Sequence, residues 1–203
     1  VKEFHKDEII SKTLLGYDNC IKVFDIIKKH KLDPFSNDDQ TIYIDEVNEY
    51  LKFNEKINGR LAKLGKSRIQ IVKDWAKMLD ERQDRILKCL VVNRDIENLQ
   101  KAKLELEKLG SIEVVSSLND NFEIMKKGVS KGNAVQQLKE IYNISEEQII
   151  CIGDGENDIS MLEYGGLRVA MGNALDQVKE KADYITKSIN DDGVDHIFEE
   201  FVL

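Results

Sequence analysis

Three acidic side chains and one amide lie within five positions in the segment Gly153-Asp154-Gly155-Glu156-Asn157-Asp158. The four residues before it, Ile149-Ile150-Cys151-Ile152, are apolar and mostly β-branched, which predicts a buried strand. Apolar residues resume at helical spacing from Ile159, so the acidic segment is expected to be a loop between a strand and a helix. Clustered carboxylates repel one another unless a cation lies between them, and a hard divalent ion such as Mg2+ prefers oxygen ligands. Asp154 and Asp158 are therefore the candidate metal ligands.

This loop has two other interpretations. It is a plain polar turn if Asp158 only caps the following helix, because aspartate is a favoured N-cap residue. The alternation of acidic residues also suggests a calcium loop, but that motif needs glycine at its sixth position and glutamate at its twelfth. Ile159 and Gly165 stand at those positions, which argues against calcium.

Two further residues are candidates for binding an anionic substrate. Lys131 lies at the start of a predicted helix, where negative charge is normally favoured, so a nearby anion would explain it. The alternative for Lys131 is a solvated surface lysine. Asn173 follows another predicted strand and would lie at the same sheet edge as Asp154, either contacting substrate or capping a helix.

The composition indicates a globular protein with one large domain or two small ones. The chain has 203 residues, of which 41% are hydrophobic and 33% are charged. A net charge of -8 argues against nucleic-acid binding, which requires a basic patch. The three cysteines form no Cys-x-x-Cys pair, so neither a zinc site nor a disulfide framework is expected. We expect a cytoplasmic protein without a membrane partner, since no apolar run reaches the length of a membrane span and no secretory pattern is present.

The predicted elements change in character near Gly128. After this point helices and strands alternate, which predicts a parallel sheet of βαβ units. The predicted helices are 131–142, 158–164, 174–181 and 192–201, and the predicted strands are 148–152, 167–171 and 183–186. We therefore expect a doubly wound α/β core from residue 127 onward.

The first 126 residues are expected to form a separate α+β lobe. The predicted strands there are 8–11, Thr41–Ile44 and Arg85–Val92, with a hairpin of Ile112–Ser117 and Asn121–Met125. The predicted helices are Tyr17–Lys29 and Asp95–Leu109, and residues 46–80 also show helical spacing.

In order and spacing, these segments resemble the haloacid dehalogenase-like hydrolases, in particular the Cof-like phosphatases. The residues that carry the resemblance are Phe122-Glu123-Ile124, Gly128-Val129-Ser130-Lys131-Gly132, Gly153-Asp154-Gly155-Glu156-Asn157-Asp158, Met161-Leu162, Val169-Ala170-Met171-Gly172-Asn173-Ala174, Ala182-Asp183-Tyr184-Ile185-Thr186 and Asp192-Gly193-Val194. The resemblance implies that residues 1–126 are a large α/β cap domain. It also implies that residues 127–203 are the C-terminal part of a doubly wound, Rossmann-like hydrolase core.

The resemblance further implies Mg2+-dependent hydrolysis of a small phosphorylated metabolite, such as a sugar phosphate, through an aspartyl-phosphate. Lys131 would steady the phosphate and the nucleophile, and Asp154 would bind Mg2+. Asn157 and Asp158 would complete the metal and phosphate end of the site. Asn173 would lie near the substrate, at the mouth between core and cap.

One motif of the family is missing from these residues. The family's attacking aspartate lies in an Asp-x-Asp-Gly-Thr motif, and Asp18-Asn19, Asp38-Asp39 and Asp191-Asp192-Gly193 do not match it. We expect roughly 80 further residues before Val1, with the nucleophile among them, and an inactive chain in their absence. Two alternatives stay open: a fragment that binds a ligand or partner without turnover, and a sugar phosphomutase. An open core edge beside the strand 148–152 would also favour self-association.

Overall fold

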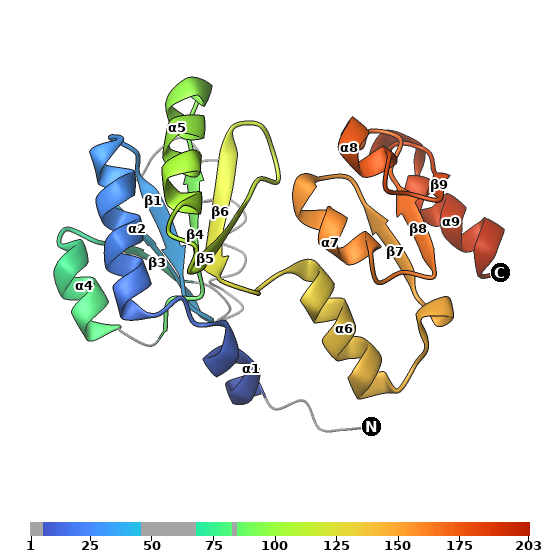
Figure 1. The fold of residues 1–203 in the computed structure, drawn as a ribbon, viewed down its shortest axis with the longest axis horizontal. Coiled ribbons are helices and arrows are strands. Elements are labelled where there is room, and N and C mark those ends of the chain that lie inside the picture. Colours follow the sequence, from blue (N-terminus) through green and yellow to red (C-terminus); the bar gives the residue numbers. More distant parts are fainter. Residues whose placement is uncertain (1–5, 46–67, 83–84) are drawn as a thin grey trace. The chain divides into compact units, whose positions relative to one another are not determined.

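The computed structural model describes residues 6–45, 68–82 and 85–203. The chain forms two compact units, which are described separately (Figure 1). We call His5–Val114 with Asn119–Lys127 the N-terminal unit, and Gly128–Leu203 with Val115–Leu118 the C-terminal unit. The assignment of 1–126 to a cap and 127–203 to a hydrolase core stays a prediction.

The N-terminal unit is built on a six-stranded mixed sheet with the order β3-β2-β1-β4-β6-β5. Its strands are β1 (Pro34–Asn37), β2 (Thr41–Ile44), β3 (Arg68–Ile71), β4 (Lys88–Val92), β5 (Ile112–Val115) and β6 (Asn121–Lys126). Strands β2 and β3 are parallel, whereas β1 pairs antiparallel with β2 and β4, and β4 pairs antiparallel with β6. Along β4 buried residues alternate with partly exposed ones, so one face of this strand carries Cys89 and Val91 into the core.

Helices cover that face of the sheet and complete its core. They are α2 (Tyr17–Lys29), α4 (Trp75–Glu81) and α5 (Ile96–Glu107), and α1 (Lys6–Thr13) precedes them (Figure 1). Val23 of α2, Leu99 of α5 and Phe122 of β6 are fully buried in one cluster. Aspartates begin two of the helices: Asp74 accepts the N–H of Lys77 and Asp95 that of Asn98.

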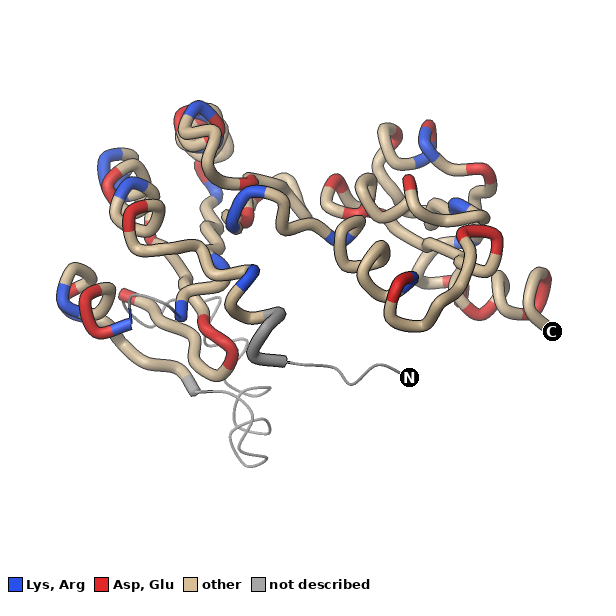
Figure 2. Tube along the Cα trace, turned by 60° about the horizontal axis from the view of Figure 1, so that its bottom comes forward, with Lys and Arg blue, Asp and Glu red and all other residues tan. Residues whose placement is uncertain are grey.

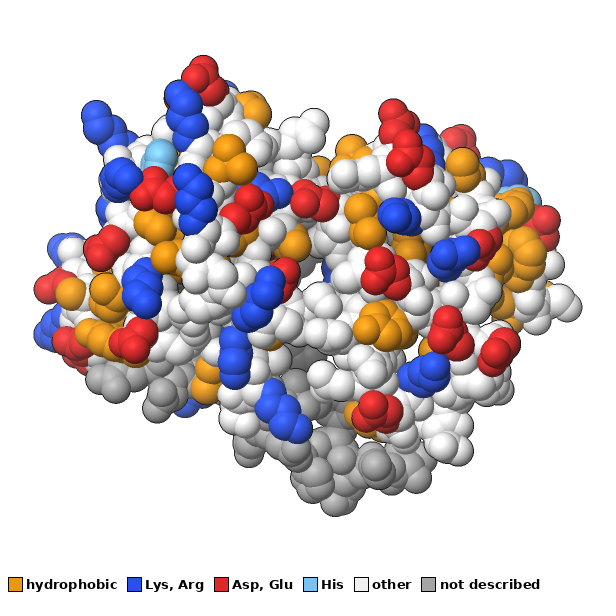
Figure 3. All heavy atoms as spheres, in the orientation of Figure 1, with side chains coloured by type: hydrophobic (Ala, Val, Ile, Leu, Met, Phe, Trp, Pro, Cys, Tyr) orange, Lys and Arg blue, Asp and Glu red, His pale blue; other side chains and the backbone are white. Residues whose placement is uncertain are grey.

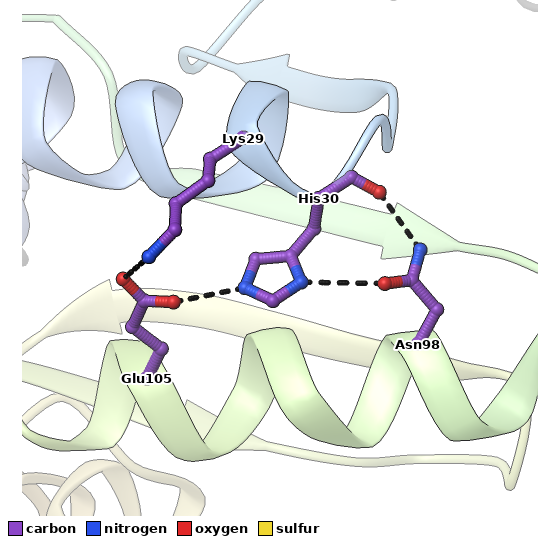
Figure 4. Close-up of polar contacts among 4 residues, drawn as sticks. All are labelled: Lys29, His30, Asn98 and Glu105. Atoms are coloured by element: carbon purple, nitrogen blue, oxygen red, sulfur yellow. Dashed lines mark hydrogen bonds and ion pairs between the residues drawn. The ribbon is translucent and has the colours of Figure 1, made fainter.

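A polar cluster links the end of α2 to α5 (Figure 4). His30 Nε2 lies 2.9 Å from Glu105 Oε2, and His30 Nδ1 lies 3.2 Å from Asn98 Oδ1. The Asn98 amide nitrogen donates to the backbone carbonyl of His30 at 2.7 Å, and Lys29 Nζ donates to Glu105 Oε1 at 2.6 Å. The hydrogen bonds from Lys29 and then from His30 lower the pKa of Glu105, so this carboxylate is stabilised in its charged form.

Several predictions for the N-terminal unit were confirmed, and two were wrong. The structure contains the predicted helix Tyr17–Lys29 and strand Thr41–Ile44, and β5 and β6 are neighbours as in the predicted hairpin. The predicted strand at 8–11 is instead part of α1, because so short an apolar run does not distinguish a strand from a helix. Of the predicted helical region 46–80, residues 46–67 lie outside the described residues, and 68–71 form β3 rather than a helix.

The C-terminal unit contains a three-stranded parallel sheet with the order β7-β8-β9. Its strands are β7 (Ile150–Gly153), β8 (Leu167–Ala170) and β9 (Tyr184–Ile185), and its helices are α6 (Lys131–Tyr142), α7 (Ile159–Leu162), α8 (Asp176–Lys179) and α9 (Gly193–Phe201). The predicted alternation of helices and parallel strands is confirmed, although α7, α8 and β9 are shorter than predicted. Within the described residues β7 pairs only with β8; whether this edge leads to self-association stays a prediction.

The surface mixes charges of both signs, and exposed apolar residues occur along α9 at the end of the chain. Figure 2 shows acidic and basic residues interspersed along both units. Exposed apolar side chains gather near the C-terminus, where Figure 3 shows a group of hydrophobic atoms; they include Val194, Phe198, Phe201 and Val202. Among the described residues, none of the helices has the length and apolar character needed to cross a membrane.

Candidate active site

All five residues predicted for the site belong to the C-terminal unit, around the ends of two adjacent parallel strands. Gly153, the last residue of β7, pairs with Ala170, the last residue of β8. The loops that follow are joined by a backbone hydrogen bond of 3.1 Å from Leu175 N–H to the Asp154 carbonyl. Residues after β7 and after β8 therefore meet at one edge, as expected for the carboxyl ends of parallel strands.

Asp158 turns its carboxylate back into its own loop. It is 5% exposed, and its Oδ2 accepts the backbone N–H groups of Asp154 at 2.9 Å and Gly155 at 3.1 Å. Its Oδ1 contacts the Lys131 ammonium group. A β-carbon at Gly153 would lie 2.4 Å from that of Asp158, so only glycine leaves room for this arrangement.

The environment of Asp158 favours its charged form. Burial raises the pKa of this carboxyl, but the hydrogen bond from Lys131 and those from the two backbone amides lower it. The positive charge of Lys131 lowers it further, and the net pKa lies below the ordinary value for aspartate. At neutral pH the loop therefore holds an anionic Asp158 next to a cationic Lys131.

Lys131 is placed by the start of α6, which is closely packed on α7. Ser130 caps the helix by accepting the N–H of Asn133 at 3.1 Å, and the N–H of Gly132 donates to Ser160 Oγ at 3.2 Å. A β-carbon at Gly132 would lie 2.2 Å from the backbone oxygen of Ser160, so this glycine permits the close approach. The Lys131 side chain is still 50% exposed, which leaves its ammonium group accessible to a ligand.

Asp154 and Asn173 form the second connection across the strand ends. The Asn173 amide nitrogen donates to Asp154 Oδ2 at 3.1 Å, and the Asn173 amide oxygen accepts the backbone N–H of Ile189 at 2.9 Å. Asp154 is exposed, and its Oδ1 has no partner among the residues that the structure describes. The predicted alternative of Asn173 as a helix cap is not what the described contacts show, since its side chain bonds to two other loops.

Asn157 lies on the same 3-10 turn, Glu156–Asp158, but is not part of this hydrogen-bonded chain. Its Oδ1 would lie 3.0 Å from a β-carbon at Gly155, so the side chain folds back over the loop. In the described part of the chain, no hydrogen bond joins it to the other four site residues. The structure thus links Lys131, Asp158, Asp154 and Asn173 in series and leaves Asn157 beside them.

The oxygen atoms at this edge fit part of a magnesium site. Mg2+ usually takes one or two carboxylates and completes its shell with water and substrate phosphate oxygens. Asp154 offers one exposed carboxylate oxygen, whereas both oxygens of Asp158 are engaged by the protein. No group of three or more His, Cys, Asp and Glu side chains that could hold a metal was found in the described ranges. Of these two aspartates, Asp154 is therefore the one with a carboxylate oxygen available to a cation.

Two features of the site were not predicted from the sequence. One is the contact between Gly132 and Ser160. The sequence shows only that two small residues lie on two predicted helices, which does not predict that they touch. The other is Ile189, whose backbone N–H anchors Asn173 from 16 positions away. A backbone donor in a loop carries no sequence signal at all.

Residues 1–198 match the sequence profile of the haloacid dehalogenase-like hydrolases. The chain belongs to this family. The HAD subclass IIB sugar phosphatase BT4131 has a similar fold, with a TM-score of 0.72 at 21% identity over 95% of this chain and 69% of that structure. The resemblance inferred from residues 122–194 is thus confirmed, and the match extends well into the N-terminal unit.

The chain covers part of the length of each of the following relatives. YxeH of Bacillus subtilis (strain 168) is 28% identical over 207 residues, which cover 100% of this chain and 73% of YxeH. The 5-amino-6-(5-phospho-D-ribitylamino)uracil phosphatase YwtE of the same organism is 37% identical over 119 residues, which cover 59% of this chain and 42% of YwtE. A haloacid dehalogenase-like hydrolase from B. subtilis has the same fold, with a TM-score of 0.80 at 22% identity over 93% of this chain and 72% of that structure.

Proposed function

We propose that this chain serves the Mg2+-dependent hydrolysis of a phosphate monoester of a small metabolite, such as a sugar phosphate. The observation that carries the proposal is the series Lys131–Asp158–Asp154–Asn173 at the ends of β7 and β8. It brings one accessible cation and one free carboxylate oxygen to a single edge of a parallel sheet. A phosphate group and its metal ion need both.

The roles proposed for Lys131, Asp154 and Asp158 follow from their contacts, and the role of Asn157 follows from its place on the same turn. An ammonium group has three donors, so Lys131 can keep its contact with Asp158 and still bind a phosphate oxygen. Asn157 is proposed as a second phosphate contact, and Asp154 as a ligand of Mg2+ through Oδ1. When bound, Mg2+ neutralises charge on the transferring phosphoryl group. Asp158 holds the lysine and the loop amides in place, and so contributes to the metal end of the site without a free oxygen of its own.

The attacking group is proposed to come from outside these 203 residues. The sequence contains no Asp-x-Asp-Gly-Thr motif, and no other aspartate matches the position of a nucleophile that forms an aspartyl-phosphate. We therefore propose that these residues alone do not turn over phosphate esters. The N-terminal unit is proposed as the cap domain that selects the leaving group, and the C-terminal unit as part of the hydrolase core.

The experiment is a phosphate-release assay on the full-length gene product with a panel of sugar phosphates, nucleotides and other phosphorylated metabolites. We expect Mg2+-dependent release, its loss in Asp154→Ala, and a decrease of more than tenfold in kcat/KM in Lys131→Ala, or about 1.4 kcal/mol. Lys139→Ala, on the same helix but paired with Glu146, is the matched control. Undiminished activity in Asp154→Ala would exclude the proposed metal role.

The same panel separates the two alternatives. A sugar phosphomutase would convert one sugar phosphate into another without accumulating inorganic phosphate. A binding protein would show saturable binding of a phosphorylated ligand with neither release nor transfer. Either result would replace hydrolysis as the assigned activity.

A further inference from the structure

Asn173 connects three loops of the C-terminal unit through one side chain. It lies after β8, donates its amide nitrogen to Asp154 Oδ2 after β7, and accepts the N–H of Ile189 after β9. A backbone N–H can only donate, so the amide oxygen of Asn173 must face Ile189. The amide nitrogen must then face Asp154, and the orientation of the side chain is fixed at both ends.

The anchor at Ile189 is held by its own surroundings. The N–H of Gly172 donates to the carbonyl of Lys187 at 3.0 Å, and a β-carbon at Gly172 would lie 2.8 Å from the backbone nitrogen of Ser188. Ser188 Oγ in turn accepts the N–H of Asn190 at 3.2 Å and donates to the Asp191 carboxylate. The loop after β9 therefore packs backbone against backbone on the loop after β8, directly beside Asn173.

The Asn173 bond distinguishes the two oxygens of the Asp154 carboxylate. An exposed aspartate without a partner can rotate and present either oxygen, or both, to a cation. With Oδ2 held by Asn173, the free oxygen is Oδ1. A carboxylate fixed in this way is prepared to bind a metal ion through one oxygen, and outer-shell bonds of this kind commonly change metal affinity by 10–100-fold.

We propose that Asn173 is a positioning residue that fixes the Asp154 carboxylate for metal binding, and that the loop 187–191 contributes to metal affinity through it. This inference rests on the proposed role of Asp154 as a metal ligand. It differs from the substrate contact predicted for Asn173 from the sequence, because both polar atoms of its amide already have protein partners. A substrate would have to displace Asp154 or Ile189 to reach them.

The test is the affinity for Mn2+, used as a spectroscopic substitute for Mg2+, measured by titration calorimetry and electron paramagnetic resonance on the full-length protein. We expect Asn173→Ala to weaken Mn2+ binding about tenfold or more. The KM for a phosphate ester at saturating Mg2+ is measured on the same variant. Asn190→Ala is the matched control. Asn190 is exposed in the anchoring loop, and the substitution keeps its backbone N–H, which donates to Ser188 Oγ.

The outcomes separate this inference from the proposed function. If Asp154→Ala abolishes Mn2+ binding while Asn173→Ala binds it like the wild type, Asn173 does not position the ligand and the inference fails alone. If Asp154→Ala also binds Mn2+ like the wild type, the proposed metal role fails with it. A raised KM in Asn173→Ala with unchanged Mn2+ affinity would restore the direct substrate contact and overturn the inference.

Discussion

The ammonium group of Lys131 contacts one oxygen of the Asp158 carboxylate, while the other oxygen of that carboxylate accepts two backbone N–H groups of the acidic loop. A lysine from the start of α6 and a loop after β7 are therefore held by the same side chain. A lysine is unfavourable at a helix N-terminus, where the helix dipole is positive. The buried Asp158 carboxylate compensates the charge of Lys131. Asp158 thus fixes two candidate functional groups at once.

Replacing Asp158 with alanine tests this double role. The partly buried backbone amide of Asp154 and the buried one of Gly155 would lose their acceptor, which costs about 1–3 kcal/mol of unfolding free energy. Lys131 would lose its partner at the same time, so kcat/KM for a phosphate ester should fall as well. Chemical denaturation and steady-state kinetics measure the two effects. Glu180→Gln, which removes an exposed carboxylate in the same unit, is the control. Wild-type stability of Asp158→Ala would contradict the assignment.

Replacing Gly132 with alanine tests the close approach of α6 to α7. Alanine is the better helix former by about 1 kcal/mol, so propensity alone predicts stabilisation. The new β-carbon would lie 2.2 Å from the Ser160 backbone oxygen, and the resulting shift costs typically about 1–3 kcal/mol. We expect a net loss of stability by denaturant titration. Gln136→Ala, exposed on the same helix, should show no loss, and stabilisation by Gly132→Ala would show that the helices are not tightly packed there.

The pair Arg168–Asp183 predicts a defined pH dependence of stability. Two side-chain hydrogen bonds from Arg168 and one from its backbone N–H lower the pKa of Asp183 to about 2 from an ordinary value of 3.8. A lowered pKa in the folded state adds stability above the ordinary value, and this stability is lost as the pH falls toward 2.

The matching variant is Asp183→Asn. Its melting temperature should lie below that of the wild type near neutral pH, and the difference should shrink between about pH 4 and pH 2. Differential scanning calorimetry over this range checks the prediction. A difference that does not change with pH would mean that the Asp183 charge makes no contribution.

The cluster around His30 predicts that Asn98 stabilises the N-terminal unit (Figure 4). The Asn98 amide nitrogen donates to a backbone carbonyl, so its oxygen faces His30 Nδ1, and the Glu105 carboxylate faces Nε2. The side chains of Asn98 and Glu105 on α5 therefore hold the His30 ring from both of its nitrogens.

We expect lower thermal stability in Asn98→Leu than in Gln100→Leu, an exposed control on the same helix, because Asn98 hydrogen-bonds to His30 at the end of α2. Thermal unfolding followed by circular dichroism measures the difference. Equal stability of the two variants would contradict a stabilising role of the cluster.

Local patterns predicted the elements that carry the site, but not the contacts among their side chains. The helix at 131–142 was predicted with its observed ends, and in the structure Ser130 is its N-cap. The order of strands and helices after residue 128 follows from periodicity. Whether Asp158 faces a metal or its own loop depends on the path of the backbone at Gly153, which periodicity does not specify.

In the N-terminal unit, sequence reasoning failed where a local signal was ambiguous. No strand was predicted at 34–37, where Pro34 opens β1, a position at which the missing N–H of proline is tolerated. Strand β3 lies within a region of helical spacing, and its parallel partner β2 is distant along the chain. Pairing between distant segments decided the structure at this strand, and a single sequence does not show such pairing.

All three cysteines are free and buried, with Cys20 and Cys89 in the N-terminal unit and Cys151 in the C-terminal unit. Burial raises the pKa of Cys20 and Cys89 to about 12 and also raises the pKa of Cys151. Only a thiolate reacts with alkylating reagents, so the native protein should resist modification until a unit opens. The labelling rate at each cysteine then reports the opening free energy of its own unit. The chain therefore carries an intrinsic probe in each half, and one alkylation time course read by mass spectrometry would show whether the halves unfold together or separately.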